Sequence, residues 1–94
     1  MQTFFLFGKY SAESLQKISA ARTKQAEKIV RDMGGKIENI YALLGEKDLV
    51  LIVSLPGLEQ AIKTSIGLSK VTGIAFSTSP AVEVSAFDKL IAKR

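Results

Sequence analysis

The chain has 94 residues, with thirteen basic and nine acidic side chains, a formal net charge of +4 and 47% hydrophobic residues. A chain of this length predicts a single domain over residues 1–94 with a modest core. It contains no cysteine and no histidine, which excludes disulfides, thiolate catalysis and the commonest metal and haem ligands, so we expect no metal and no cofactor. No apolar stretch approaches the roughly 20 residues that a membrane-spanning helix needs, and the N-terminus lacks the basic region of a signal peptide, so we expect a soluble, cytoplasmic protein without a membrane partner.

The N-terminal part of the chain predicts a central strand followed by a helix. Four consecutive apolar residues, Phe4–Phe7, place aromatic side chains on both faces of an extended segment. Ser11 is a suitable N-cap, and apolar residues then recur at three- and four-residue spacing as far as Met33. Because Gly34-Gly35 is a typical helix end, the pattern predicts one long helix between Ser11 and these glycines.

A hairpin is predicted in the middle of the chain. Residues 36–44 alternate partly between polar and apolar, and residues 49–55 form a nearly continuous apolar run that is typical of a strand covered on both faces. The segment Gly45-Glu46-Lys47-Asp48 between them predicts a tight turn. In this turn Gly45 would supply a positive φ, and Asp48 would accept hydrogen bonds from nearby backbone amides.

The C-terminal part predicts a helix, an edge strand and a second, shorter helix. After the Pro56-Gly57 break, the periodicity predicts that the inner face of the helix consists of Leu58, Ala61, Ile62, Ser65, Ile66 and Ser69. A strand follows over residues 74–81, and Pro80 restricts it to a sheet edge because proline cannot donate to a ladder. The spacing of Ser85 and Asp88 resembles a capping box at the start of a short helix, and the basic pair Lys93-Arg94 suits its C-terminal end.

The order of elements is therefore β-α-β-β-α-β with a short terminal helix. Right-handed crossovers around a four-stranded antiparallel sheet make this an α+β, ferredoxin-like fold, with the first and third strands central and two helices on one face. The opposite face of the sheet would carry no helix.

The hairpin predicts which side chains lie on that helix-free face. A tight turn places Leu44 opposite Leu49 and Tyr41 opposite Ile52, and side chains across a strand pair share a face. The helix side would then carry Ile40, Ala42, Leu44, Leu49, Leu51 and Val53, and the helix-free face would carry Asn39, Tyr41, Leu43, Val50, Ile52 and Ser54. Because the second set is also mostly apolar, we expect a homodimer or higher homo-oligomer that buries this face, over at least about 1,200 Å² in total.

Three polar residues of the helix-free face, Asn39, Tyr41 and Ser54, are candidate ligand-binding residues. Tyr10 and Arg22 could join them from the end of the first strand and from the first helix. Polar groups set in an apolar surface are the usual make-up of a small-molecule site. Since this register places no acidic residue on the face, the expected ligand is small and apolar, and neutral or weakly anionic.

Simpler structural roles compete with this assignment. Asn39 and Ser54 could form a cross-strand hydrogen bond, and Arg22 could be a solvated charge. No residue is assigned as catalytic. RNA-recognition modules share the same element order, but they display aromatic residues on their first and third strands. Here residues 49–55 contain none, so we expect no nucleic-acid partner.

The chain resembles the GYD-domain family over essentially its whole length. The resemblance rests on Lys9-Tyr10, Gly34-Gly35-Lys36, Tyr41, Gly45-x-x-Asp48 before an apolar strand that ends at Pro56, and Phe87-Asp88-Lys89-Leu90. Lys47 stands where the family usually has tyrosine, so no role of that tyrosine is carried over. The resemblance implies a ferredoxin-like fold and a dimeric α+β barrel, but no established activity.

Two functions from different classes fit these observations. The first is a homo-oligomeric small-molecule-binding or sensing module. The second is a cofactor-independent, oxygenase-like enzyme of the dimeric α+β-barrel type, which the lack of histidine and tryptophan makes less favourable.

Overall fold

The computed structural model describes residues 1–92, so the basic pair Lys93-Arg94, expected to end the last helix, lies outside the described part. The elements are β1 (Gln2–Lys9), α1 (Ala12–Gln16), α2 (Ala20–Asp32), β2 (Lys36–Ala42), β3 (Leu49–Leu55), α3 (Leu58–Thr72), β4 (Ala75–Ala81) and α4 (Val84–Ala92).

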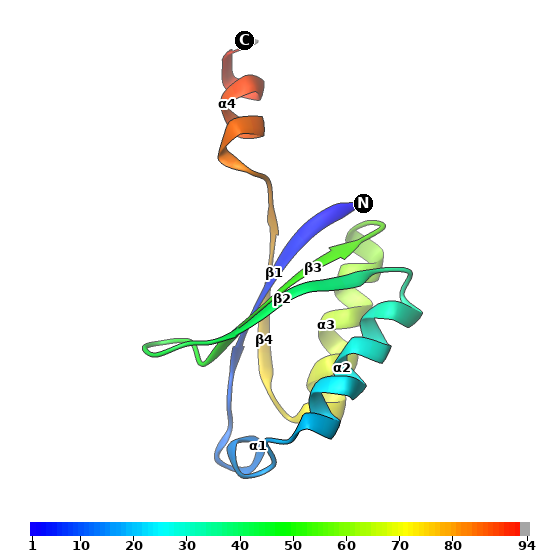
Figure 1. Ribbon diagram of the computed structural model, residues 1–94, viewed down its shortest axis with the longest axis vertical. Helices are drawn as coiled ribbons and strands as arrows, with labels where there is room; N and C mark the ends of the chain where they lie inside the picture. The colour runs from blue at the N-terminus through cyan, green and yellow to red at the C-terminus, as the bar shows by residue number, and fades with distance from the viewer. Residues whose placement is uncertain (93–94) are drawn as a thin grey trace.

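The four strands form one antiparallel sheet in the order β2-β3-β1-β4. α2 and α3 cover one face of this sheet (Figure 1), which confirms the predicted ferredoxin-like fold. The most apolar strands, β1 and β3, are central, and β4, which contains Pro80, lies at an edge. Both placements agree with the prediction.

The hydrophobic core lies between the sheet and the two long helices. Alternate residues of the central strands point into it, with Phe4 and Leu6 from β1 and Val53 from β3 at most 1% exposed. Val30 of α2 and Leu68 of α3 meet them from the helix side and are equally buried. The contacts between one face of the sheet and the two helices α2 and α3 therefore make up the core of the domain.

The single long helix predicted between Ser11 and Met33 is wrong, because the chain breaks there into α1 and α2. Ser14 closes a capping box with Ser11 at the start of α1. Ser19 then restarts the chain as the N-cap of α2, where its side chain accepts a hydrogen bond from the Arg22 amide at 3.1 Å. Serine side chains that bond to the backbone compete with helix continuation, and they outweigh the apolar periodicity here.

The hairpin loop is longer than the predicted tight turn. β2 ends at Ala42, and the Leu43 amide donates to the Asp48 carbonyl at 2.8 Å. As a result Tyr41 lies opposite Val50 rather than Ile52. Because the displacement is two residues, the predicted faces are retained from Asn39 to Ala42 and in the residues of β3 opposite them. Leu44, predicted to pack under the helices, is instead fully exposed in the loop.

Two further predictions for the helices are wrong. Of the residues predicted for the inner face of α3, Ala61 is buried as expected, but the other buried residues are Thr64, Leu68 and Thr72, and the aliphatic residues Leu58, Ile62 and Ile66 are exposed. Ser85 does not cap the last helix but lies inside it, since α4 begins at Val84. α4 itself extends away from the rest of the domain (Figure 1).

Candidate functional site

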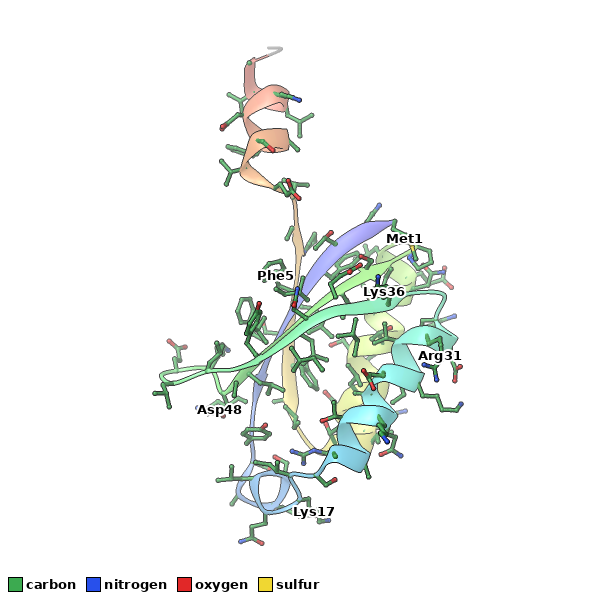
Figure 2. All side chains as sticks on the ribbon, in the orientation of Figure 1. Met1, Phe5, Lys17, Arg31, Lys36 and Asp48 are labelled. Atoms are coloured by element: carbon green, nitrogen blue, oxygen red, sulfur yellow. The ribbon has the colours of Figure 1, made fainter. Side chains whose placement is uncertain are left out.

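The helix-free face of the sheet is apolar at its centre. Phe5 and Phe7 of β1 have ring centroids 6.2 Å apart, and they lie opposite Ile52 and Val50 of β3, respectively. Phe5 points away from the helix layer (Figure 2). Although no helix covers this face, Val50 is only 6% exposed and the other three side chains are half-buried. The surface is thus a continuous aromatic and aliphatic patch.

The polar residues predicted for this face lie around that patch. Asn39 pairs with Ile52, Tyr41 pairs with Val50, and both side chains are exposed on the edge strand β2. The register shifts between Ile37 and Asn39, as in a β-bulge. Ser54 donates its hydroxyl hydrogen to Glu38 Oε2 at 2.7 Å.

Two predictions about this region are therefore wrong. Ser54 bonds to Glu38 rather than to Asn39, and the contact brings a carboxylate to the side of Ser54, where none was expected. The bulge is responsible, because one extra residue in β2 changes the side-chain alternation.

Tyr10 and Arg22 lie together, but away from the other three candidates. The guanidinium carbon of Arg22 is 5.5 Å from the centroid of the Tyr10 ring, within the range of a cation–π contact. Arg22 Nη1 also donates to the Ser14 carbonyl, at 2.6 Å. Tyr10 packs against the core on the helix side of the sheet. The five candidates thus divide into a helix-free-face group and a Tyr10–Arg22 group.

The Tyr10–Arg22 pair borders an apolar cavity between α2, α3 and the sheet. Its volume is about 80 Å³. Apart from the pair, its lining is largely aliphatic and aromatic and includes Ala26, Leu51, Leu68, Ile74 and Phe76. Among the described residues Arg22 forms no ion pair. A cationic group therefore stands beside an apolar space and has one carbonyl and one aromatic face as neighbours.

Sequence reasoning missed most of this lining. Ile74 follows α3, Phe76 lies on β4, and Leu68 comes from α3, so no short motif unites them. The available signal was the pairing of a tyrosine at a strand end with an arginine in the first turn of the next long helix. The periodicity could not place that arginine, because it did not reveal the helix break at Ser19.

Asp48 joins the hairpin to the end of β1. Its Oδ2 accepts a hydrogen bond from the Tyr10 amide at 2.8 Å, and its own amide donates to the Gly8 carbonyl at 2.9 Å. Gly45 has a φ of +128°, a value that favours glycine. Gly45 therefore has the positive φ expected of it, whereas Asp48 accepts from the amide of Tyr10, just after β1, rather than from a nearby amide of the turn.

We expect Asp48→Ala to lower the free energy of unfolding by about 1–3 kcal/mol, because the part-buried Tyr10 amide would lose its acceptor. Asp48→Asn, which keeps an acceptor oxygen, should lose less. Urea denaturation measures both. Glu46→Ala is the matched control, because the Glu46 side chain is exposed in the same loop. An equal loss in Asp48→Ala and Glu46→Ala would contradict this role.

α1 carries an exposed ion pair. Lys17 Nζ lies 2.9 Å from Glu13 Oε1 on α1, and this hydrogen bond holds the pKa of Glu13 below its ordinary value. Both side chains are exposed, so the pair contributes little to stability. Residues 1–92 contain no cluster of three acidic side chains that could hold a metal ion, and none of their helices is long and apolar enough to cross a membrane.

Comparisons with known proteins bear on this arrangement. The family model described as GYD domain matches residues 4–91. No curated protein matches the chain. Among solved structures, the leucine response regulatory protein of Mycobacterium tuberculosis is similar, with a TM-score of 0.58 at 10% identity, over 87% of this chain and 51% of that one.

An AsnC family transcriptional regulator from Agrobacterium tumefaciens is also similar, with a TM-score of 0.58 at 18% identity, over 86% of this chain and 50% of that one. These likenesses show a shared fold. The chain spans about half the length of both structures.

Proposed function

The chain belongs to the GYD domain family, and we propose that it is a homo-oligomeric small-molecule-binding or sensing module. Its fold is similar to part of the structure of two regulators. One of those regulators is named for its response to leucine. The likeness to about half the length of each regulator is one of fold. This likeness supports a binding module and leaves the ligand to be argued from the residues of this chain.

The observation that carries the proposal is the position of Arg22 beside the apolar cavity. A guanidinium there can donate hydrogen bonds to a carboxylate, while the lining accepts an aliphatic group. At about 80 Å³, the cavity is about half the size of an engineered cavity of roughly 150 Å³ that holds benzene. We therefore propose a small apolar carboxylate with a short branched aliphatic chain as the ligand class.

The helix-free face serves assembly in this proposal. Its centre of Phe5, Phe7, Val50 and Ile52 is the kind of apolar patch that another sheet covers. Asn39, Tyr41 and Ser54 would then form the polar margin of a sheet-to-sheet interface, as in a dimeric α+β barrel. A homodimer built this way leaves the cavity beside Arg22 accessible, because the cavity lies on the helix side of the sheet.

Calorimetric titration with 3-methylbutanoate and with the neutral 3-methylbutan-1-ol tests the ligand class. We expect the acid to bind and the alcohol to bind more weakly. Arg22→Gln should weaken acid binding roughly 10- to 100-fold, the usual effect of losing a charged hydrogen-bond partner. Arg31→Gln, a substitution at an exposed position of the same helix, is the matched control.

Equal binding of the acid and the alcohol would contradict the role of Arg22. So would an equal loss in the Arg22 and Arg31 variants. Thermal unfolding of both variants without ligand separates a binding effect from a loss of stability.

A further inference from the structure

α4 carries an apolar stripe that no part of its own domain covers. Val84, Phe87, Leu90 and Ile91 fall on one side of the helix at three- and four-residue spacing, and they are 72%, 51%, 61% and 50% exposed. None of the nine residues of α4 is buried. The helix extends beyond the end of β4, away from the sheet (Figure 1).

Such a helix needs a partner surface. Isolated helices shorter than about 12–15 residues are marginal in water, and most helical stability comes from the packing of an amphipathic face. α4 has nine residues and a clearly separated apolar side. Its stability therefore depends on a surface that lies outside the contacts of its own chain.

A matching surface lies on the outer side of α3. Leu58, Ile62 and Ile66 form an exposed stripe there, at a spacing of four residues. They border a groove of about 200 Å³ between α3 and β4, to which Pro80 also contributes. The floor of the groove includes Phe4 and Ala61 of the core.

The two stripes agree in length and in charge. At 1.5 Å per residue, residues 84–91 of α4 extend about 10 Å and residues 58–66 of α3 extend about 12 Å. Asp88 borders the stripe on α4, whereas Glu59 and Lys63, an ion pair at 3.2 Å, border the stripe on α3. With an acidic residue beside one stripe and both charges beside the other, the two helices can approach without strong repulsion.

We propose that α4 of one copy lies in the groove between α3 and β4 of a second copy of this chain. A second copy is favoured over the same chain because α4 continues beyond the end of β4, away from α3 and the sheet of its own chain (Figure 1). Phe87, at the centre of the stripe, is the anchoring side chain. This contact is separate from the helix-free face, so a chain that uses both surfaces can form assemblies larger than a sheet-to-sheet dimer.

Single-cysteine variants of the full chain provide the test, since the natural sequence contains no cysteine. Ser65→Cys places a thiol in the groove, and Ala86→Cys places one on α4 next to its stripe. An affinity tag on one variant distinguishes the mixed product from the others. The Ser65→Cys and Ala86→Cys variants are mixed with a short bis-maleimide. They should cross-link at least about tenfold faster than a control mixture of Ala86→Cys with Asn39→Cys, whose thiol lies on the helix-free face. The reason is that docking raises the effective thiol concentration in the groove.

A second substitution tests the anchor. Phe87→Ser in the Ala86→Cys chain should reduce the mixed cross-linking rate to that of the Asn39 control, whereas Lys89→Ser should leave the rate unchanged. Since α4 has no buried residue within its own chain, both changes should leave the melting temperature unaltered at protein concentrations too low for docking. This control separates loss of docking from loss of folding.

Three results would overturn the proposal. One is a cross-link within a single chain when Ser65→Cys and Ala86→Cys are combined, which would show that α4 occupies its own groove. Another is faster linkage of Ala86→Cys to Asn39→Cys, which would place α4 on the helix-free face. The third is a mixed cross-linking rate that does not exceed the Asn39 control. None of these results depends on the proposed ligand.

Discussion

Replacing Ile52 with glutamate is expected to convert the proposed homo-oligomer into a folded monomer. Ile52 lies on the central strand β3, between Phe5 on one neighbour and Asn39 on the other. In a sheet-to-sheet interface the new carboxylate would be buried in an apolar surface without a partner, which is among the costliest changes a protein contact can undergo. In the monomer the same carboxylate is solvated, because this face carries no helix.

Light scattering after size exclusion, over a range of micromolar concentrations, measures the effect. We expect the dissociation constant of the assembly to rise at least about 100-fold, since burying an uncompensated charge costs several kcal/mol. Gln25→Glu adds the same charge on the exposed side of α2 and should leave the assembly intact. A natural protein that is a stable monomer at these concentrations, or an Ile52→Glu variant that assembles normally, would refute the interface.

The central sheet was predictable because its residues obey one strong rule. Continuous apolar runs at Phe4–Phe7 and residues 49–55 can be stable only where both faces are covered, so both strands had to be central. Pro80 restricted its strand to an edge for an equally local reason. The faces were also predictable from Asn39 to Ala42 and in the residues of β3 opposite them, since a two-residue displacement preserves side-chain alternation.

The helices were harder to predict because apolar spacing alone does not say which stripe meets the sheet. On α3 the small Ala61 and the polar Thr64 face inward, and Ile62 and Ile66 face outward. A helix turned so that Ile62 and Ile66 faced the sheet would bury more hydrophobic side chains. A small residue allows the helix to approach the sheet closely, and this advantage depends on the shape of the neighbouring strands rather than on the sequence of the helix.

The candidate site was predicted in part. Tyr10 and Arg22 were selected for their chemistry, and the structure brings the two together, but on the other side of the sheet from Asn39, Tyr41 and Ser54. Two hydrogen bonds, one local and one between distant segments, caused this division. Ser19 restarts the helix and so sets the direction of Arg22, and Asp48 holds the Tyr10 backbone at the end of β1. Hydrogen bonds between distant segments are not visible in periodicity.

Matched alanine substitutions of the adjacent residues Phe4 and Phe5 distinguish the core from the proposed interface. Phe4 is 1% exposed in the core beneath the helices, so Phe4→Ala should cost about 3–5 kcal/mol of unfolding free energy at any protein concentration. Phe5 is half-buried on the helix-free face. Phe5→Ala should therefore mainly weaken assembly, and its apparent destabilisation should grow under conditions where the natural protein is assembled.

Urea denaturation of both variants at two protein concentrations, about a hundredfold apart, separates these effects. The difference between natural protein and Phe4→Ala should be the same at both concentrations. For Phe5→Ala the difference should be small at the lower concentration and larger at the higher one, because only the assembled state buries that ring against another chain. Losses that do not change with concentration in either variant would mean that Phe5 stabilises only its own domain, and the helix-free face would then not be an interface.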